Sequence, residues 1–185
     1  MAAVIGLPDD RLEDLVASGG AYGILTVANR NSPGQIVISG ERAAVEAAAD
    51  AAKGLGARLA KLLPVSVAAH SPLMADAAAG MRTALAPVAF HDPDAPLLAN
   101  ADAAPLTTGE ACRAELIEHL TRGVDWVAAV TAMTDAGVRT FVEVGPGRVL
   151  AGLVKRIDSE ATIIAIDDIT TEGGLVLPRE SSTQE

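Results

Sequence analysis

The spacing of apolar residues in the first third of the chain switches several times between the period of a strand and that of a helix. These switches predict a regular order of elements. Short apolar runs bounded by turn residues predict β-strands at residues 2–7, 24–29, 35–39 and 57–62. Amphipathic patterns predict helices at 9–18 and 41–55, the second rich in alanine. The predicted order is β-α-β-β-α-β. This order favours a ferredoxin-like split βαβ sheet with both helices on one face.

Helical and extended patterns alternate more closely from residue 65 onward. Helices are expected at 73–86, 109–120, 124–136 and 149–157, and strands at 140–144 and 162–166. A proline-rich loop separates the first two of these helices. The overall fold class is therefore expected to be α/β. The pattern divides the chain into a first part at 1–64, a second part at 65–167 and a flexible tail at 168–185.

One histidine, His70, stands between an extended run predicted at residues 65–67 and the start of a helix. Ser71 and Pro72 after it are typical of a helix N-cap and a first helical position. The positive end of the helix dipole disfavours a protonated imidazole there, and a general base needs a neutral ring. A histidine that merely fills a turn is the plainer alternative, because one titratable residue without a partner is weak evidence of chemistry.

Two further blocks of sequence have a distinctive order of elements. Residues 27–40, VANRNSPGQIVISG, predict two apolar strands joined by a polar, turn-rich loop. Residues 140–153, TFVEVGPGRVLAGL, predict a buried strand, a Gly-Pro-Gly turn and an amphipathic helix. The glycines of that turn lack the Gly-x-Gly-x-x-Gly spacing of phosphate-binding loops, so a plain turn is the safer interpretation.

Taken in order with His70, these blocks resemble the malonyl-CoA:acyl carrier protein transacylases, and the resemblance extends to about Asp167. It implies a ferredoxin-like small subdomain followed by the later part of an α/β acyltransferase subdomain. It also implies an enzyme of fatty acid biosynthesis, which transfers malonyl groups from malonyl-CoA to acyl carrier protein through an acyl-serine intermediate. No metal and no resident cofactor are implied, because the phosphopantetheine belongs to the carrier protein.

The resemblance also implies roles for individual residues. His70 falls on the catalytic histidine of the family, and Asn29 and Asn31 fall on loop asparagines that contact the pantetheine or acyl portion. Turn formation is an equally good explanation of the two asparagines. His119 falls on a position whose main-chain carbonyl orients the catalytic imidazole, so that its own side chain is expected to do no more than end a helix.

The serine nucleophile of the family has no counterpart in the printed sequence. The family carries a Gly-His-Ser-x-Gly elbow and a malonyl-binding arginine in its N-terminal portion, and no serine here lies in Gly-x-Ser-x-Gly. We therefore expect a C-terminal piece that is active only with a missing N-terminal half. Two alternatives stay open: a non-catalytic remnant that binds carrier protein or an acyl chain, and a ferredoxin-like regulatory module unrelated to acyl transfer.

Composition limits the partners and the compartment. The net charge of −10 argues against nucleic acid, and no apolar run approaches the length of about 20 residues that spans a bilayer. The single cysteine, Cys112, fits a reducing compartment, and the first residues lack a signal peptide's basic region, so a cytoplasmic protein is expected. An acidic carrier protein would need a local basic patch, unless the basic residues are only scattered surface charges. The candidates are Lys53, Arg58, Lys61, Arg148, Lys155 and Arg156.

The residue before the histidine bears on substrate choice. Ala69 stands where relatives of the family carry a bulky phenylalanine or a serine, and a smaller residue enlarges the acyl pocket. Discrimination against one methyl group by shape alone contributes only ~1–3 kcal/mol. The sequence therefore leaves malonyl over methylmalonyl as a preference.

Overall fold

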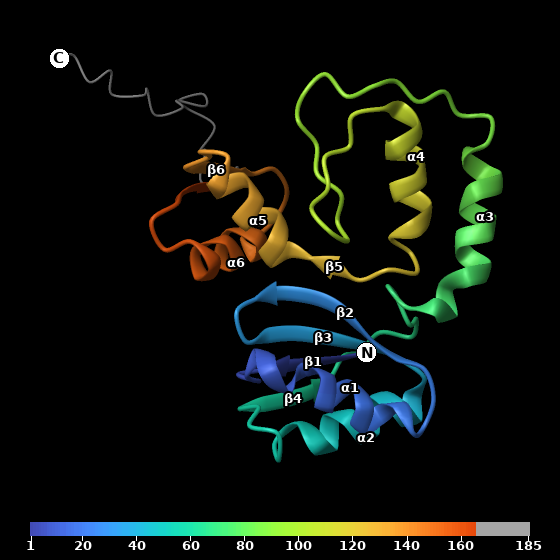
Figure 1. Cartoon of the computed structure of the whole chain (residues 1–185), viewed down its shortest axis with the longest axis vertical. Helices are drawn as coiled ribbons and strands as arrows, with labels where there is room; N and C mark the ends of the chain where they lie inside the picture. Colours follow the sequence, from blue (N-terminus) through green and yellow to red (C-terminus); the bar gives the residue numbers. More distant parts are fainter. Residues whose placement is uncertain (166–185) are drawn as a thin grey trace.

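Strands and helices alternate along residues 1–165, which are the part of the chain that the computed structural model describes (Figure 1). The elements are β1 (Ala2–Ile5), a 3-10 turn (Asp9–Arg11), α1 (Leu12–Gly20), β2 (Leu25–Ser32), β3 (Gln35–Gly40), α2 (Arg42–Ala52), β4 (Leu59–Leu62), a 3-10 turn (Pro72–Met74), α3 (Ala75–Leu85), α4 (Gly109–Glu118), β5 (Val124–Asp125), α5 (Trp126–Asp135), β6 (Thr140–Glu143), α6 (Val149–Ile157) and β7 (Thr162–Ala165). The expected α/β class is confirmed. The predicted tail at 168–185 lies outside the described residues.

The larger sheet has the strand order β4-β1-β3-β2-β5. β1 is antiparallel to both β3 and β4, and β2 is antiparallel to β3. Each of α1 and α2 therefore connects two parallel strands that are separated by one other strand. The two helices lie next to each other on one side of the sheet (Figure 1).

Aliphatic side chains and alanines make up the core under these helices. Leu15 of α1, Val4 of β1 and Ile38 of β3 are fully buried, and burial of a side chain of this size stabilises the fold by about 1.5–3 kcal/mol. Alanines of α2 complete the same cluster. A Cβ atom on Gly19 would lie 2.4 Å from the carbonyl oxygen of Ala44, so the two helices approach each other backbone to backbone.

The fifth strand of this sheet comes from much later in the sequence. Val124 and Asp125 form β5, which pairs in parallel with Asn29 and Arg30 of β2. A helix starting at residue 124 was expected, and this was wrong by two residues. α5 begins at Trp126 because Asp125 is its N-cap: the Oδ1 atom of Asp125 accepts a hydrogen bond from the N–H of Ala128 at 2.9 Å.

α3 and α4 lie beside each other above the sheet, and a long loop joins them (Figure 1). Arg113 of α4 holds the end of α3 and the start of this loop by donating hydrogen bonds to the carbonyl oxygens of Leu85 and Val88. Its guanidinium lies 4.7 Å from the centre of the Phe90 ring. Thr108 caps α4, because its hydroxyl oxygen accepts from the N–H of Ala111 at 3.1 Å.

The last described elements form a second, smaller core. β6 and β7 are parallel neighbours, and α5 and α6 cover them with a cluster centred on Val130, Val154 and Ala161. Much apolar surface stays uncovered there: Val144 is 78% exposed and Val149 is 73% exposed. No helix within residues 1–165 is long and apolar enough to cross a membrane.

Candidate active site

His70 sits in the segment between β4 and α3 with an unusual backbone conformation. Its φ angle is +58°, in the left-handed region that residues other than glycine seldom adopt. The hydroxyl of the buried Ser71 donates to the carbonyl oxygen of Ala68 at 2.7 Å, and that of Thr26 donates to the carbonyl oxygen of His70 at 3.3 Å. The segment is therefore bonded on both sides of the strained residue.

The predicted helix start after His70 is correct only in part. Ser71 is at the N-cap position and Pro72 follows it, but the Ser71 side chain makes no cap hydrogen bond because its hydroxyl is engaged with Ala68. The first three residues, Pro72–Met74, form a 3-10 turn that leads into α3. The extended run predicted at residues 65–67 is not a strand.

One ring nitrogen of His70 faces two main-chain carbonyl groups. Its Nδ1 atom lies 2.7 Å from the carbonyl oxygen of His119 and 3.2 Å from that of Arg122. A carbonyl oxygen can only accept, so Nδ1 must carry the proton in the neutral ring. The lone pair of the neutral imidazole is then on Nε2, which is the arrangement that a general base uses.

The side chain of His119 does not take part in this contact. His119 is the residue that ends α4, and its own Nδ1 lies 2.9 Å from the carbonyl oxygen of Glu115. The two imidazole rings are 6.0 Å apart between centroids. The structure therefore brings His70 and the His119 carbonyl together, while the His119 ring is directed at its own helix.

Asn29 lies in the strand that was predicted to end there, and Asn31 lies on the same strand, where a loop was expected. β2 extends to Ser32, and two shifts of register against β3 leave Ala28 and Asn31 unpaired in it. The bulges allow the polar residues to stay in the strand because they interrupt its alternation of faces. Asn29 pairs with Val124, two residues beyond the Arg122 carbonyl that contacts His70. The structure places no described contact between Asn31 and His70.

The helix after the Gly-Pro-Gly turn has a hydrogen-bond partner that sequence analysis missed. Glu143, the last residue of β6, accepts hydrogen bonds at its two carboxylate oxygens from the N–H groups of Leu150 at 3.0 Å and Ala151 at 2.8 Å. These are first-turn donors of α6, which have no partner within the helix. The sequence signal that could have predicted this contact is a glutamate placed directly before a turn and a helix.

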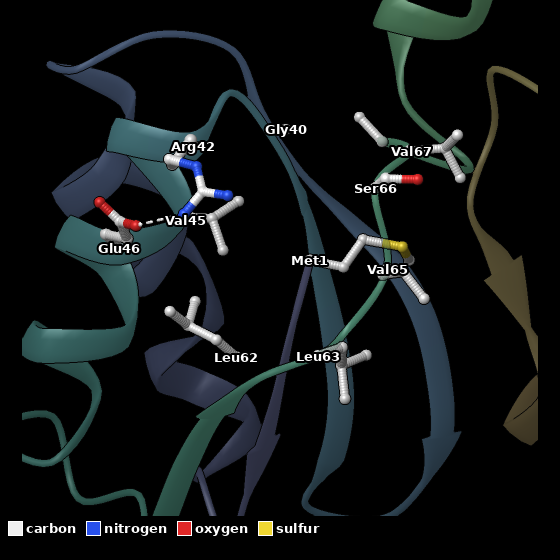
Figure 2. A pocket seen from close by; sticks show the side chains of 11 residues that line it. Met1, Gly40, Arg42, Val45, Glu46, Leu62, Leu63, Val65, Ser66 and Val67 are labelled. Atoms are coloured by element: carbon white, nitrogen blue, oxygen red, sulfur yellow. Dashed lines mark hydrogen bonds and ion pairs between the residues drawn. The ribbon is translucent and has the colours of Figure 1, made fainter.

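A pocket of about 200 Å³ lies between α2 and the segment that leads to His70 (Figure 2). Arg42 and Glu46 of α2 form an ion pair of 3.2 Å at this pocket, and Leu63 and Val65 come from the facing segment. His70 does not line the pocket. The pocket is therefore separate from the imidazole and its two carbonyl partners.

Two of the basic residues predicted to form a docking patch are engaged within the chain. The ammonium group of Lys155 donates to the carbonyl oxygens of Ser159 and Ala161. Arg156 donates to the side-chain oxygen of Gln35, which ties α6 to the larger sheet. The docking role of the patch stays a prediction.

Comparison with known proteins identifies the family. Residues 20–170 match the model of the acyl transferase domain. The chain belongs to the acyl transferase domain family. The resemblance to malonyl-CoA:acyl carrier protein transacylases is thereby confirmed at the level of the family.

Similar proteins are named malonyl CoA-acyl carrier protein transacylases. The malonyl CoA-acyl carrier protein transacylase of Escherichia coli strain K12 is 40% identical over 168 residues, which are 91% of this chain and 54% of that protein. The structure of the corresponding transacylase of Coxiella burnetii superposes with a TM-score of 0.85 at 36% identity, covering 89% of this chain and 52% of that one.

A third similar protein was solved together with a partner. The malonyl-transacylase PlMCAT, in complex with the type II polyketide synthase acyl-carrier protein AntF, superposes with a TM-score of 0.85 at 38% identity. The match covers 89% of this chain and 53% of PlMCAT. The chain thus spans about half the length of each of these relatives.

Proposed function

We propose that this chain supplies the general base of a malonyl-CoA:acyl carrier protein transacylase, and that His70 is that base. The observation that carries the proposal is the pair of carbonyl oxygens at Nδ1, which leaves Nε2 of the neutral ring free to accept a proton. Membership of the acyl transferase domain family gives the chemistry in which such a base acts.

The proposed reaction has two acyl-transfer steps. A serine hydroxyl from a complementary polypeptide attacks the thioester carbonyl of malonyl-CoA while His70 Nε2 accepts the hydroxyl proton. The carbon–sulfur bond breaks, the thiolate of coenzyme A leaves with that proton, and a malonyl-serine ester remains. The phosphopantetheine thiol of the carrier protein then gives its proton to Nε2 and attacks the ester. The proton returns to the serine oxygen as the malonyl group leaves.

The complementary polypeptide would carry the serine elbow and would cover apolar surface that is open here. A cavity of about 550 Å³ and another of about 320 Å³ lie against the second core and share Trp126, Met133 and Val138. Most of their lining is apolar, and the indole N–H of Trp126 has no partner among residues 1–165. Apolar surface of this extent is typical of a face that another polypeptide covers.

We also infer that residues 1–64 are the ferredoxin-like small subdomain of the family and that the acyltransferase subdomain follows it. The strand order β4-β1-β3-β2 with antiparallel neighbours supports this division. One detail departs from it, because β5 belongs to the second part in sequence and to the first sheet in space.

A complementation assay tests the proposed function. The chain is mixed with the recombinant N-terminal half of the Escherichia coli relative, and malonyl transfer from malonyl-CoA to acyl carrier protein is followed by intact mass. We expect transfer with both halves, no acyl adduct on this chain alone, and a loss of at least about 100-fold for His70→Ala.

The controls separate the alternatives. Arg42→Met, at the exposed ion pair of Figure 2, should transfer malonyl as fast as the wild type. An adduct on the purified chain would contradict our account of the nucleophile, and undiminished transfer by His70→Ala would contradict the base assignment. Binding of carrier protein without transfer in any mixture would favour a non-catalytic remnant instead.

A further inference from the structure

The two carbonyl groups that hold His70 belong to a short segment that ends in β5. His119 and Arg122 provide the carbonyl oxygens, and after Gly123 the chain continues as Val124 and Asp125, the fifth strand of the larger sheet. The position of the carbonyls relative to the imidazole therefore depends on how β5 is attached to β2.

β5 has little hydrogen bonding of its own to secure it. It pairs with β2 over only two residues, Val124 opposite Asn29 and Asp125 opposite Arg30. The segment before β5 comes very close to β2 just before this pairing, since a Cβ on Gly123 would lie 2.4 Å from the carbonyl oxygen of Val27. A small displacement of β5 would thus be transmitted to the Arg122 carbonyl two residues earlier.

An ion pair connects the two strands at the end of this pairing. Nη1 of Arg30 lies 3.3 Å from Oδ2 of Asp125, and the Asp125 side chain is only 22% exposed. The other carboxylate oxygen caps α5 through Ala128, and the main-chain N–H of Asp125 donates to the carbonyl oxygen of Asn100 at 2.8 Å. Asp125 therefore joins β2, α5 and the preceding loop at one point.

We propose that Arg30 and Asp125 are positioning residues that keep the carbonyl oxygens of His119 and Arg122 in register with the His70 ring. Neither side chain touches the reacting atoms. They act by holding β5 on β2, so that the proton of the neutral ring stays on Nδ1 and the lone pair stays on Nε2. The inference rests on the proposed function of His70 and adds the means by which its orientation is maintained. A misplacement of about 1 Å at such a site is enough to reduce a rate strongly.

The test measures the tautomer of His70 directly. Long-range proton–nitrogen correlation spectra of the nitrogen-15-labelled chain report which ring nitrogen carries the proton, and they are recorded at alkaline pH, where imidazole groups in general are neutral. Three variants are compared with the wild type: Arg30→Met removes the ion pair, Asp125→Asn weakens it and keeps the oxygen that caps α5, and Arg30→Lys keeps the positive charge.

The matched control is Arg42→Met, which removes the exposed ion pair with Glu46 on α2 and leaves β2 and β5 untouched (Figure 2). We expect the ratio of the Nδ1–H to the Nε2–H form to fall by about two- to fivefold in Arg30→Met and Asp125→Asn, the size expected for a half-exposed ion pair. Arg30→Lys should keep more of the wild-type ratio than Arg30→Met, and Arg42→Met should keep all of it.

Several outcomes would overturn the proposal. An unchanged ratio in both Arg30→Met and Asp125→Asn would show that the ion pair does not position the carbonyls. An equal fall in Arg42→Met would show that the effect is not specific to β5. If Asp125→Asn fails to fold, as judged by its amide spectrum, the comparison of Arg30→Met with Arg30→Lys decides alone.

The complementation assay separates this inference from the proposed function. If His70→Ala keeps its transfer activity, the proposed function fails, whatever the tautomer spectra show. If His70→Ala is inactive while Arg30→Met keeps both its tautomer ratio and its rate, the proposed function stands and the positioning role fails. If Arg30→Met loses rate and tautomer ratio together, both are supported.

Discussion

The Nδ1 atom of His70 lies 2.7 Å from the main-chain oxygen of His119, and the His119 ring is bonded to a different group. The contact joins the end of α4 to the segment before α3. It depends on the backbone of His119 alone, so the identity of the residue there matters only through the helix end that it forms.

The first prediction concerns the side chain of His119. His119→Ala removes the hydrogen bond between its ring and the Glu115 carbonyl, which should lower the free energy of unfolding by about 1 kcal/mol. The carbonyl is kept, so the Nδ1–H tautomer of His70 should still predominate. Urea unfolding and ring-nitrogen spectra measure the two effects, and a loss of that tautomer in His119→Ala would mean that the side chain orients His70.

The second prediction concerns the backbone of His70. At a φ of +58° an alanine is strained by about 1–2 kcal/mol, while glycine is not. His70→Gly should therefore unfold at a higher urea concentration than His70→Ala. At an exposed helical position such as Ala77 in α3, replacement by glycine should instead lower the free energy of unfolding by about 1 kcal/mol. The same sign at both positions would contradict the left-handed conformation.

The third prediction concerns the approach of Gly123 to β2. Gly123→Ala would place a Cβ 2.4 Å from the Val27 carbonyl oxygen, so the backbone must move, at a cost of about 1–3 kcal/mol. Gly80→Ala in α3 is the matched control, because a Cβ there meets nothing within 4 Å. It should stabilise the chain by up to about 1 kcal/mol. Thermal unfolding distinguishes the two, and equal stability of both variants would exclude the close approach.

The fourth prediction concerns pH and the pair of Asp102 with Arg122. The hydrogen bond from Arg122 at 2.9 Å, helped by the N–H of Ala104, holds the pKa of the Asp102 carboxyl below its ordinary value of 3.8. A depressed pKa means that the pair stabilises the folded state at pH values above 3.8 and loses that contribution as the pH falls below it.

Asp102→Asn measures that contribution. The Asp102 side chain is about half exposed, so the free energy of unfolding of the wild type should exceed that of the variant by only about 0.2–1 kcal/mol at neutral pH. The difference should disappear in acid. Urea midpoints over a pH series give both quantities, and a difference that persists in strong acid would show that it comes from something other than the ionised pair.

The amino-acid sequence was enough to predict most elements and the catalytic candidate. The buried faces of α1, α2 and the central strands follow from apolar periodicity, because each must cover the same core. α6 begins and ends at the predicted residues, since a Gly-Pro-Gly turn precedes an amphipathic stretch. His70 was singled out by its place before Ser71 and Pro72 and by the family resemblance. The match of residues 20–170 to the acyl transferase domain confirms that family.

Tertiary contacts decided what local sequence could not express. Asn31 belongs to a bulged strand because β3 pairs with β2 as far as Ser32, whereas local turn preference favoured a loop after Asn29. Val124 joins a sheet whose other strands lie about a hundred residues earlier in the sequence. A strand of two residues is too short for apolar periodicity to predict this pairing. The same holds for the two carbonyl oxygens at Nδ1: every residue has a carbonyl, so only the folded chain selects those of His119 and Arg122.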